Sequence, residues 1–235
     1  MNAGRTARER ARVELTQEIT DAARRQLAEV GAEALSLRAV ARELGMVSSA
    51  LYRYFPSRDD LLTALIVDAY DALGDAAAEA DRQAGRHPTR RWRAVSAGVR
   101  DWAREHRYEY ALIYGSPVPG YQAPRTTVAP AARVPLLVIG IVRDCWNAGE
   151  LHVPADPPAL SQVLDQQIET LANLFAPELP HSVLTRGLIA WTQLFGMISF
   201  ELFGQLVGSV DPSDEFFSHA SAQMAEFVGL PRLAH

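Results

Sequence analysis

The side chains best suited to meet the base edges of a nucleic acid lie together in residues 47–53. They are Val47, Ser48, Ser49 and Arg53. Serine hydroxyls and an arginine guanidinium can meet the edges of bases in the DNA major groove, where sequence is read. They can do so only if they lie at the start, or on the polar side, of a helix that fits this groove. The residues around them must therefore build and hold such a helix.

Residues 36–55 have the pattern of two short helices joined by a tight turn. Apolar residues recur at helical spacing in the first half and again in the second half. Gly45 lies between the halves and can end the first helix, because glycine adopts a positive backbone dihedral φ without steric cost. Ser48 or Ser49 can cap the second helix, and Pro56 stops it. This is the pattern of a helix-turn-helix, whose second helix lies in the DNA major groove.

A helix-turn-helix needs further helices on either side to bury its apolar stripe. Residues 13–30 carry apolar residues at helical spacing, and Gly31 is a natural stop. Ser57 and Asp60 resemble a capping box, with aspartate in place of the usual glutamate. The helix that they begin is predicted to continue through Leu73. It can join a DNA-binding head to the rest of the chain and act as a mechanical lever.

Three motifs in register resemble the DNA-binding segment of TetR-family transcriptional regulators. The resemblance covers residues 16–65, and its motifs are S-L-R-x-V-A-x-x-L-G from Ser36, S-S-x-L-Y-x-Y-F from Ser48 and S-R-x-x-L-L from Ser57. An isolated motif of this kind is most often just two packed helices. Together, and with the flanking helices, the three motifs indicate a DNA-binding domain.

A second set of residues is expected to contact the DNA backbone. Ser36 can cap the first helix and reach a phosphate through its hydroxyl or the amides behind it. The resemblance implies that Tyr52, Tyr54 and Arg58 contact phosphates, which positions a protein without specifying sequence. Core packing is the alternative role for both tyrosines. The predicted DNA-binding residues are Ser36, Arg38, Val47, Ser48, Ser49, Tyr52, Arg53, Tyr54 and Arg58.

Charge is distributed unevenly along the chain. Residues 1–58 hold 10 arginines against 7 acids, whereas residues 59–235 hold 13 against 21. The overall net charge of −5 argues against a protein that coats nucleic acid indiscriminately. Residues 1–12 contain Arg5, Arg8, Arg10 and Arg12. They form either a flexible basic arm that reaches phosphates or the minor groove, or a solvated, frayed terminus.

The remainder of the chain also has helical periodicity. We predict an all-α fold, with a three-helix helix-turn-helix DNA-binding domain and basic arm in residues 1–58. A larger helical domain for ligand binding and dimerisation follows in residues 59–235. Its further helices are predicted at residues 89–105, 131–148, 158–175, 181–207 and 212–228, with a tyrosine-lined loop at residues 115–121.

Five aromatic residues in the helical body could line a ligand pocket. They are Trp102, Tyr110, Tyr114, Tyr121 and Trp146. Pockets between helices are mostly apolar with a few polar groups, which this set would provide. For each residue taken singly, ordinary core packing is the competing interpretation.

The helix at residues 181–207 is apolar nearly all round, so it must be buried on every side. A chain of 235 residues would struggle to cover it alone. We therefore expect residues 158–175 and 181–207 to form half of an intermolecular four-helix interface, as the equivalent pair does in TetR-like dimers. The predicted dimer residues are Leu164, Ile168, Leu171, Leu188, Phe195 and Leu202.

One C-terminal motif resembles the WHG type of TetR regulatory domain. It is W-x-x-L-F-G from Trp191, taken together with residues 110–124. Phe195 stands where that type has histidine, so the polar role of that histidine does not carry over.

The sequence contains none of the motifs typical of enzymes or metal sites. It lacks a serine elbow, a phosphate-binding glycine loop and a zinc-protease motif, and its six histidines lie far apart. We predict no enzyme activity, no cofactor and no metal. The single cysteine, Cys145, excludes an internal disulfide, and an inert buried thiol is favoured over a redox sensor. Residues 187–200 are apolar but too short to span a bilayer, so a cytoplasmic protein without a membrane partner is expected.

These observations predict a homodimeric, sequence-specific DNA-binding regulator that grips a palindromic operator in double-stranded DNA. The resemblance implies a repressor released by a small apolar or amphipathic molecule, with activation as an alternative. Two other classes stay open. One is a helical enzyme or binding protein that keeps the head as a relic, and the other is a ligand-independent architectural DNA binder.

Overall fold

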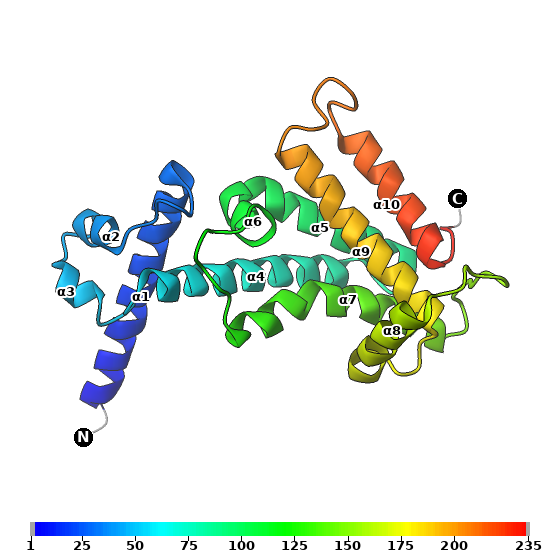
Figure 1. Ribbon diagram of the computed structural model, residues 1–235, viewed down its shortest axis with the longest axis horizontal. Helices are drawn as coiled ribbons and strands as arrows, with labels where there is room; N and C mark the ends of the chain where they lie inside the picture. The colour runs from blue at the N-terminus through cyan, green and yellow to red at the C-terminus, as the bar shows by residue number, and fades with distance from the viewer. Residues whose placement is uncertain (1–2, 234–235) are drawn as a thin grey trace. The chain divides into compact units, whose positions relative to one another are not determined.

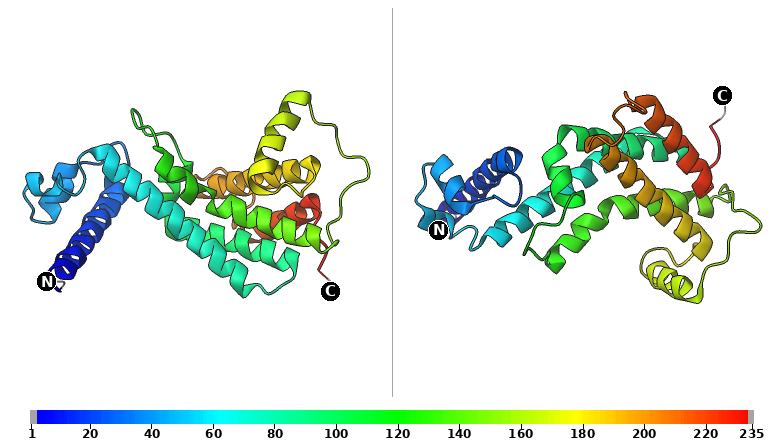
Figure 2. Two further views of the ribbon diagram at one scale, coloured as in Figure 1. Left: turned by 90° about the horizontal axis from the view of Figure 1, so that it is seen from below. Right: turned by 45° about the horizontal axis from the view of Figure 1, so that its top comes forward.

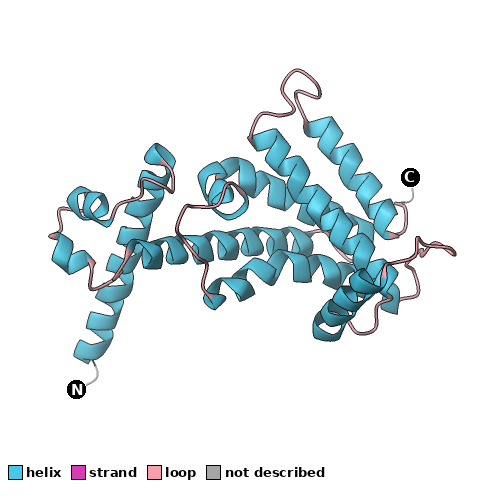
Figure 3. Ribbon diagram, viewed as in Figure 1, coloured by secondary structure: helices cyan, strands magenta, loops and turns pink. Residues whose placement is uncertain are grey.

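The computed structural model describes residues 3–233, and every regular element in that range is helical (Figures 1 and 3). The predicted all-α fold is therefore confirmed. In chain order the elements are α1 (Ala3–Val30), α2 (Leu37–Glu43), α3 (Ser48–Leu51), α4 (Arg58–Gln83), α5 (Pro88–Glu105), α6 (Arg107–Tyr114), the 3₁₀ turn η1 (Arg125–Thr127), α7 (Val128–Asn147), α8 (Gln162–Phe175), α9 (His181–Leu202) and α10 (Asp214–Val228).

The chain is divided into two compact units, and the division does not fall at the predicted boundary, residue 58. The first unit comprises residues up to Asp71 together with His106–Pro130, and the second comprises Ala72–Glu105 and the residues from Ala131 onward. Residues 106–130 belong to the first unit because Leu112, Val118 and Tyr121 pack against its apolar core. Helix α4, which was predicted to reach Leu73, continues to Gln83.

The core of the first unit is built from one face of each of its first four helices. Figure 1 shows α2 and α3 beside α1, with the start of α4 next to them. This arrangement confirms that the helix predicted at residues 13–30 packs across the helix-turn-helix. The buried side chains are Ile19, Ala22, Ala23, Leu35, Leu37, Val40, Ala41, Leu51, Phe55, Leu61, Leu62 and Leu65.

The predicted flexible arm is wrong for residues 3–12, which form the first turns of α1. Alanine and arginine are strong helix formers, and this stretch is rich in both. Arg8, Arg10 and Arg12 therefore project from a helix and are exposed to solvent. Residues 1–2 and the side chain of Arg5 lie outside the described part of the chain.

The second unit is held together by α5, α9 and α10, which pack on one another. The indole of the buried Trp92 on α5 donates to the carbonyl of Ser221 on α10 at 3.0 Å. The helices α9 and α10 lie side by side in Figures 1 and 2, and α8 packs on α9. Packing of α5 against both neighbours explains the row of apolar residues that predicted this helix.

A buried arginine ties the same three helices together. The guanidinium of Arg100 on α5 lies 2.7 Å from the carboxylate of Glu201 on α9 and 2.9 Å from that of Asp214 on α10. It also lies over the ring of Phe217, 4.7 Å from the ring centroid. Its side chain is only 8% exposed, so these partners replace most of its hydration.

Several helix boundaries differ from those expected. Helix α8 begins at Gln162 and not at residue 158, and α10 begins at Asp214 and not at residue 212. Helix α7 begins at Val128, so Pro135 lies inside the helix and not near its start. Helix α9 ends at Leu202 and not at Val207, because the following turns carry Gly204 and Gly208 with φ of 82° and 79°. The apolar stretch predicted at residues 187–200 is part of this 22-residue helix.

Among the described residues, α9 is the helix that is long and apolar enough to cross a membrane. One such helix is weak evidence, because the core helix of a soluble protein passes the same test. Here α9 packs against α5, α8 and α10 within its own unit.

Removing the Arg100 guanidinium should destabilise the second unit strongly. The variant Arg100→Ala leaves Glu201, whose side chain is 15% exposed, without its main partner. We expect a loss of about 3–5 kcal/mol in the free energy of unfolding. Thermal and denaturant unfolding followed by circular dichroism will measure it.

Arg104→Ala is the matched control, because Arg104 contacts the same two carboxylates from a side chain that is 49% exposed. It should cost no more than about 1 kcal/mol. Equal losses from the two variants would contradict a special role for the buried guanidinium.

Candidate functional site

The turn between α2 and α3 has the geometry that the sequence predicted. Gly45 has φ of 65°, and its N–H donates to the carbonyl of Arg42 at 3.2 Å. The N–H of Met46 donates to the carbonyl of Ala41 at 2.8 Å. These paired bonds close the end of α2 and direct the chain into α3.

The cap of α3 is not a serine. Val47, in an extended conformation, occupies the N-cap position, and Ser48 and Ser49 are the first two residues of the helix. The predicted serine cap is therefore wrong. The consequence is that neither hydroxyl is consumed in capping α3, and Ser49 is exposed while Ser48 is partly buried.

Helix α3 is shorter than predicted, because regular helix ends at Leu51 and not at Phe55. Beyond Leu51 the chain forms a tight turn, in which the N–H of Tyr54 donates to the carbonyl of Leu51 at 2.8 Å. Leu51 is fully buried in the core of the first unit, whereas Arg53 is exposed. Only the solvent side of this short helix and the turn after it are available for contact.

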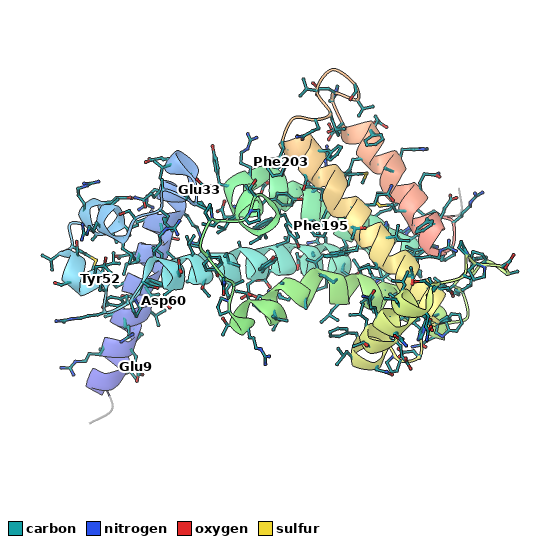
Figure 4. All side chains as sticks on the ribbon, viewed as in Figure 1. Glu9, Glu33, Tyr52, Asp60, Phe195 and Phe203 are labelled. Carbon is teal, nitrogen blue, oxygen red and sulfur yellow. The ribbon has the colours of Figure 1, made fainter. Side chains whose placement is uncertain are left out.

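Five of the predicted DNA-binding residues are exposed to solvent. Val47 is 71% exposed and Tyr52 is 42% exposed. Figure 4 labels Tyr52 at the end of α3. The structure exposes Arg38, Val47, Ser49, Tyr52 and Arg53 and leaves Ser36, Ser48, Tyr54 and Arg58 partly buried.

Arg42, which is not among the predicted DNA-binding residues, is exposed one helical turn after Arg38 on α2. Their spacing of four residues places both guanidiniums on one face of the helix. Within residues 3–233, neither these two arginines nor Arg53 takes part in an ion pair. Their charge is free to meet an anionic surface.

The side chain of Tyr54 packs against the apolar core of the first unit and does not extend into solvent. Its ring lies beneath the guanidinium of Arg12, 5.5 Å from the ring centroid. The contact ties the turn after α3 to the N-terminal half of α1. Arg12 therefore meets the helix-turn-helix from a helix, although the sequence placed it on an arm.

Arg58 holds the connection between α1 and α2. Its guanidinium donates to the backbone carbonyls of Ala32 at 2.7 Å, Glu33 at 3.0 Å and Leu35 at 3.2 Å. The side chain is 30% exposed. These bonds engage Nε and Nη2 and give Arg58 a structural role, while its phosphate contact stays a prediction.

The start of α4 forms one half of the predicted capping box, the bond from the Asp60 N–H to the Ser57 side chain. The N–H of Asp60 donates to Oγ of Ser57 at 3.1 Å, and that hydroxyl donates to the Asp60 carboxylate at 2.7 Å. Ser36 does hold the N-cap position of α2, but its hydroxyl makes no capping bond. Its backbone N–H instead donates to the side chain of Gln26 at 2.7 Å.

The predicted ligand-binding aromatics divide between the two units. In the first unit Tyr110 and Tyr114 have ring centroids 5.2 Å apart. Burial raises the pKa of Tyr114 above its ordinary value. The hydroxyl of Tyr121 bonds to that of Thr63 at 2.9 Å.

In the second unit, Trp102 is buried and Trp146 is partly buried. An apolar cavity of about 210 Å³ lies between α7, α8 and α9 of this unit. None of the five predicted aromatic residues lines it, and the lining includes Ala132, Pro135, Ile168, Leu171, Gly187 and Trp191.

The predicted dimer residues fall into two groups. Ile168 and Phe195 are buried within the protomer, whereas Leu171 and Leu188 are each 40% exposed. Leu164 and Leu202 are partly buried. Further exposed apolar side chains on α8 and α9 were not singled out from the sequence, namely Val163, Leu174, Phe175, Ile189 and Phe200.

The chemistry of the remaining candidate groups is limited. Burial raises the pKa of Cys145 to about 11, which disfavours the reactive thiolate. No group of three or more histidine, cysteine, aspartate or glutamate side chains able to hold a metal occurs in residues 3–233.

Comparisons with known families find two matches that together cover most of the chain. Residues 19–65 match the family described as bacterial regulatory proteins, tetR family. Residues 92–224 match the family described as tetracyclin repressor-like, C-terminal domain. The WHG type of the regulatory domain stays a prediction.

Curated relatives agree with these matches. HTH-type transcriptional regulator Rv1816 of Mycobacterium tuberculosis is 39% identical over 203 residues, which cover 83% of each chain. HTH-type transcriptional regulator Mb1846 of Mycobacterium bovis has the same identity and coverage.

Solved structures share the fold over nearly the whole chain. SCO4313, a candidate regulatory protein, is 33% identical with a TM-score of 0.76, covering 93% of this chain and 98% of its own. A protein of unknown function from Rhodococcus sp. RHA1 is 26% identical with a TM-score of 0.69, covering 93% and 96%. PfmR of Thermus thermophilus, a TetR family transcriptional regulator, shows the same fold at 19% identity and a TM-score of 0.55, covering 91% and 99%.

Replacement of Arg58 should destabilise the first unit. Arg58→Ala removes the donors for three carbonyls between α1 and α2. A hydrogen bond to a charged group contributes about 1.5–3 kcal/mol, so we expect a loss of about 2–3 kcal/mol on unfolding. Denaturant unfolding measures this loss.

Arg53→Ala is the control, because Arg53 is exposed and lies in the same helix-turn-helix. It should change stability by no more than about 0.5 kcal/mol. An Arg58→Ala protein as stable as the parent would contradict the structural role.

Proposed function

The chain belongs to the TetR family of bacterial transcriptional regulators, and from this premise we propose that it is a repressor that leaves its operator when a small apolar or amphipathic molecule binds. DNA binding by this chain is supported by the exposed side chains on α2, on α3 and in the turn after α3. Buried Leu51 fixes the helix, and the residues beside it remain in solvent.

Base reading is assigned to the residues at the start of α3 and just after it. Val47, Ser49 and Arg53 are exposed, and Ser48, next to them in sequence, is partly buried. Serine and arginine can distinguish base edges in the major groove. Arg38, Arg42 and Tyr52 are suited to phosphates, which fix the orientation of the protein on the duplex.

Dimerisation is supported by the apolar surface of α8 and α9. The most exposed of its large apolar side chains are Val163 at 66%, Leu174 at 67% and Phe200 at 56%. Large apolar side chains exposed in such number on two neighbouring helices favour an interaction site there. A second copy of the chain would cover it around a two-fold axis, and two identical heads would then match a palindromic operator.

Release by a ligand follows from a shift between two states of the dimer. A molecule that binds the second unit more tightly in the DNA-free state moves the population toward that state. Equal affinity for both states would move nothing, however tight the binding. The regulator acts in the cytoplasm, where its operator lies, and catalyses no reaction.

Selection of DNA from a random duplex pool tests the regulator assignment. Binding should be carried out at one fixed ionic strength of about 150 mM, since phosphate contacts make affinity depend on salt. We expect one inverted repeat to be enriched. A folded dimer that enriches no sequence would contradict the assignment.

Within this experiment, Arg53→Ala should change the preferred bases and not only the overall affinity. Loss of a base contact costs about 1–3 kcal/mol for the preferred base. Arg90→Ala provides the control, since Arg90 is an exposed arginine on α5 in the second unit. If Arg53→Ala weakened specific and random DNA equally, Arg53 would not be a base reader.

Leu174→Asp should convert the dimer into a monomer. Its side chain is 67% exposed on α8, so an aspartate there leaves the protomer core intact but places a charge in the proposed interface. Val13→Asp is matched in exposure, at 68%, and lies on α1. Sedimentation velocity should show a monomer for the first variant and a dimer for the second. A dimer in both cases would place the interface elsewhere.

A further inference from the structure

The face of α1 that packs on the helix-turn-helix changes from apolar to basic toward its N-terminal end. Ala22 and Ile19 are fully buried in the core of the first unit, and Leu15 packs against that core. Arg12 and Arg8 continue this row at steps of three and four residues, which places them on the same face of the helix. The stripe that holds the helix-turn-helix therefore continues as a pair of guanidiniums.

These two arginines lie beyond the core that α2 and α3 help to build. Figure 1 shows the first turns of α1 extending past α3. The side chains of Arg8 and Arg12 are exposed, and within residues 3–233 neither takes part in an ion pair. Among the described residues, no carboxylate neutralises their charge, which stays available to an anionic partner.

Arg12 shows that this face of α1 is turned toward the proposed DNA-binding surface. Its guanidinium lies over the ring of Tyr54, 5.5 Å from the ring centroid. Tyr54 belongs to the turn directly after α3 and follows the exposed Arg53 in sequence. Arg8 lies about one helical turn, or about 6 Å along the axis, beyond Arg12 and on the same side.

The helical state of this segment matters for its affinity. A flexible terminus loses about 1–2 kcal/mol of conformational entropy for each residue that binding orders. Residues 3–12 are already part of α1, so the spacing of the two guanidiniums is set before any partner arrives. Each contact with an anion would therefore contribute more to binding than the same contact made by a disordered tail.

This basic extension precedes the part of the chain that the tetR-family match describes, which begins at residue 19. Arg8 and Arg12 are therefore additions to the matched helix-turn-helix. Their place on α1 is specific to the sequence and structure of this chain.

We infer that the first turns of α1 form a rigid arm that binds the phosphate backbone of DNA through Arg8 and Arg12, beside the groove that α3 enters. Guanidiniums bind phosphate oxygens by charge-assisted hydrogen bonds, and such contacts position a protein without reading sequence. The inference rests on the proposed function and adds a contact outside the helix-turn-helix. In a dimer on a palindromic operator, the two arms would make two equivalent sets of contacts.

Arg8→Ala and Arg10→Ala are a matched pair of variants for testing the arm. Each removes one exposed arginine from α1, so net charge and helix propensity change equally. The two positions are about 200° apart around the helix, so Arg10 points away from the face that carries Arg8 and Arg12. A general effect of positive charge would appear in both variants, whereas a phosphate contact would appear only in the first.

The affinity of the full-length protein for the selected operator is measured over a series of salt concentrations. Each phosphate contact contributes about 0.9 to the slope of log affinity against log salt concentration. A dimer has two arms, so Arg8→Ala should reduce the slope by about two and weaken operator and random DNA alike. Arg10→Ala should change it by less than about 0.5. Equal slopes for the two variants would overturn the contact.

Hydroxyl-radical footprinting on the same operator locates the contact. The parent protein should protect backbone positions beside each groove that α3 enters, and Arg8→Ala should leave these positions open. Arg10→Ala should give the parental pattern. A footprint that Arg8→Ala leaves unchanged would speak against the arm as surely as equal slopes.

Ala11→Pro tests whether the arm must be rigid. Proline lacks the N–H of the helical hydrogen bond and clashes with the preceding turn, so it breaks α1 between Arg12 and Arg8. Ala11 is exposed and lies outside the core, so the helix-turn-helix should stay folded, which denaturant unfolding checks. We expect the slope and footprint of Arg8→Ala although Arg8 is still present. A parental slope would mean that a flexible arm suffices and would overturn a rigid one.

Failure of the arm and failure of the proposed function give different results. Enrichment of an inverted repeat, together with equal slopes for Arg8→Ala and Arg10→Ala, would refute the arm alone. A selection that enriches no sequence would refute the regulator, and slopes measured on random duplex DNA would still decide whether the arm binds phosphates.

Discussion

The proposed DNA-binding surface depends on how the four-residue helix α3 is held in place. A helix as short as α3 cannot form alone, because nucleation fixes several residues for very few hydrogen bonds. Burial of Leu51 and Phe55 in the core of the first unit supplies the missing stability. The bonds at Gly45 and Met46 set its entry, and the guanidinium of Arg58 fixes the loop that precedes α2.

Local rules predicted much of this first unit. Apolar periodicity located its helices, and the positive φ of Gly45 followed from the need for a sharp turn. The rules failed where two local preferences compete or where partners lie far apart in sequence. Two serines at the start of α3 suggested a serine cap, yet the backbone of Val47 takes that position. The partners of Arg58 lie 23 to 26 residues away, and no periodicity reveals them.

The second unit shows a different limit of sequence reasoning. Large aromatic residues attract attention as pocket candidates, but this cavity arises where side chains are absent, at Ala132 and Gly187. Likewise, periodicity shows that α8 and α9 are rich in apolar residues without showing which face meets the protomer's own core. Ile168 faces that core, and Leu174 faces solvent. Only the packing of neighbouring helices separates the two cases.

The ion pairs of Arg100 and the proposed contacts with DNA differ in their sensitivity to salt. Dissolved ions screen exposed charges effectively but reach a guanidinium that is 8% exposed only weakly. Contacts with DNA phosphates, in contrast, weaken steeply as ionic strength rises. A rise in intracellular salt on osmotic upshift would therefore weaken the proposed operator contacts while the buried ion pairs of Arg100 persist.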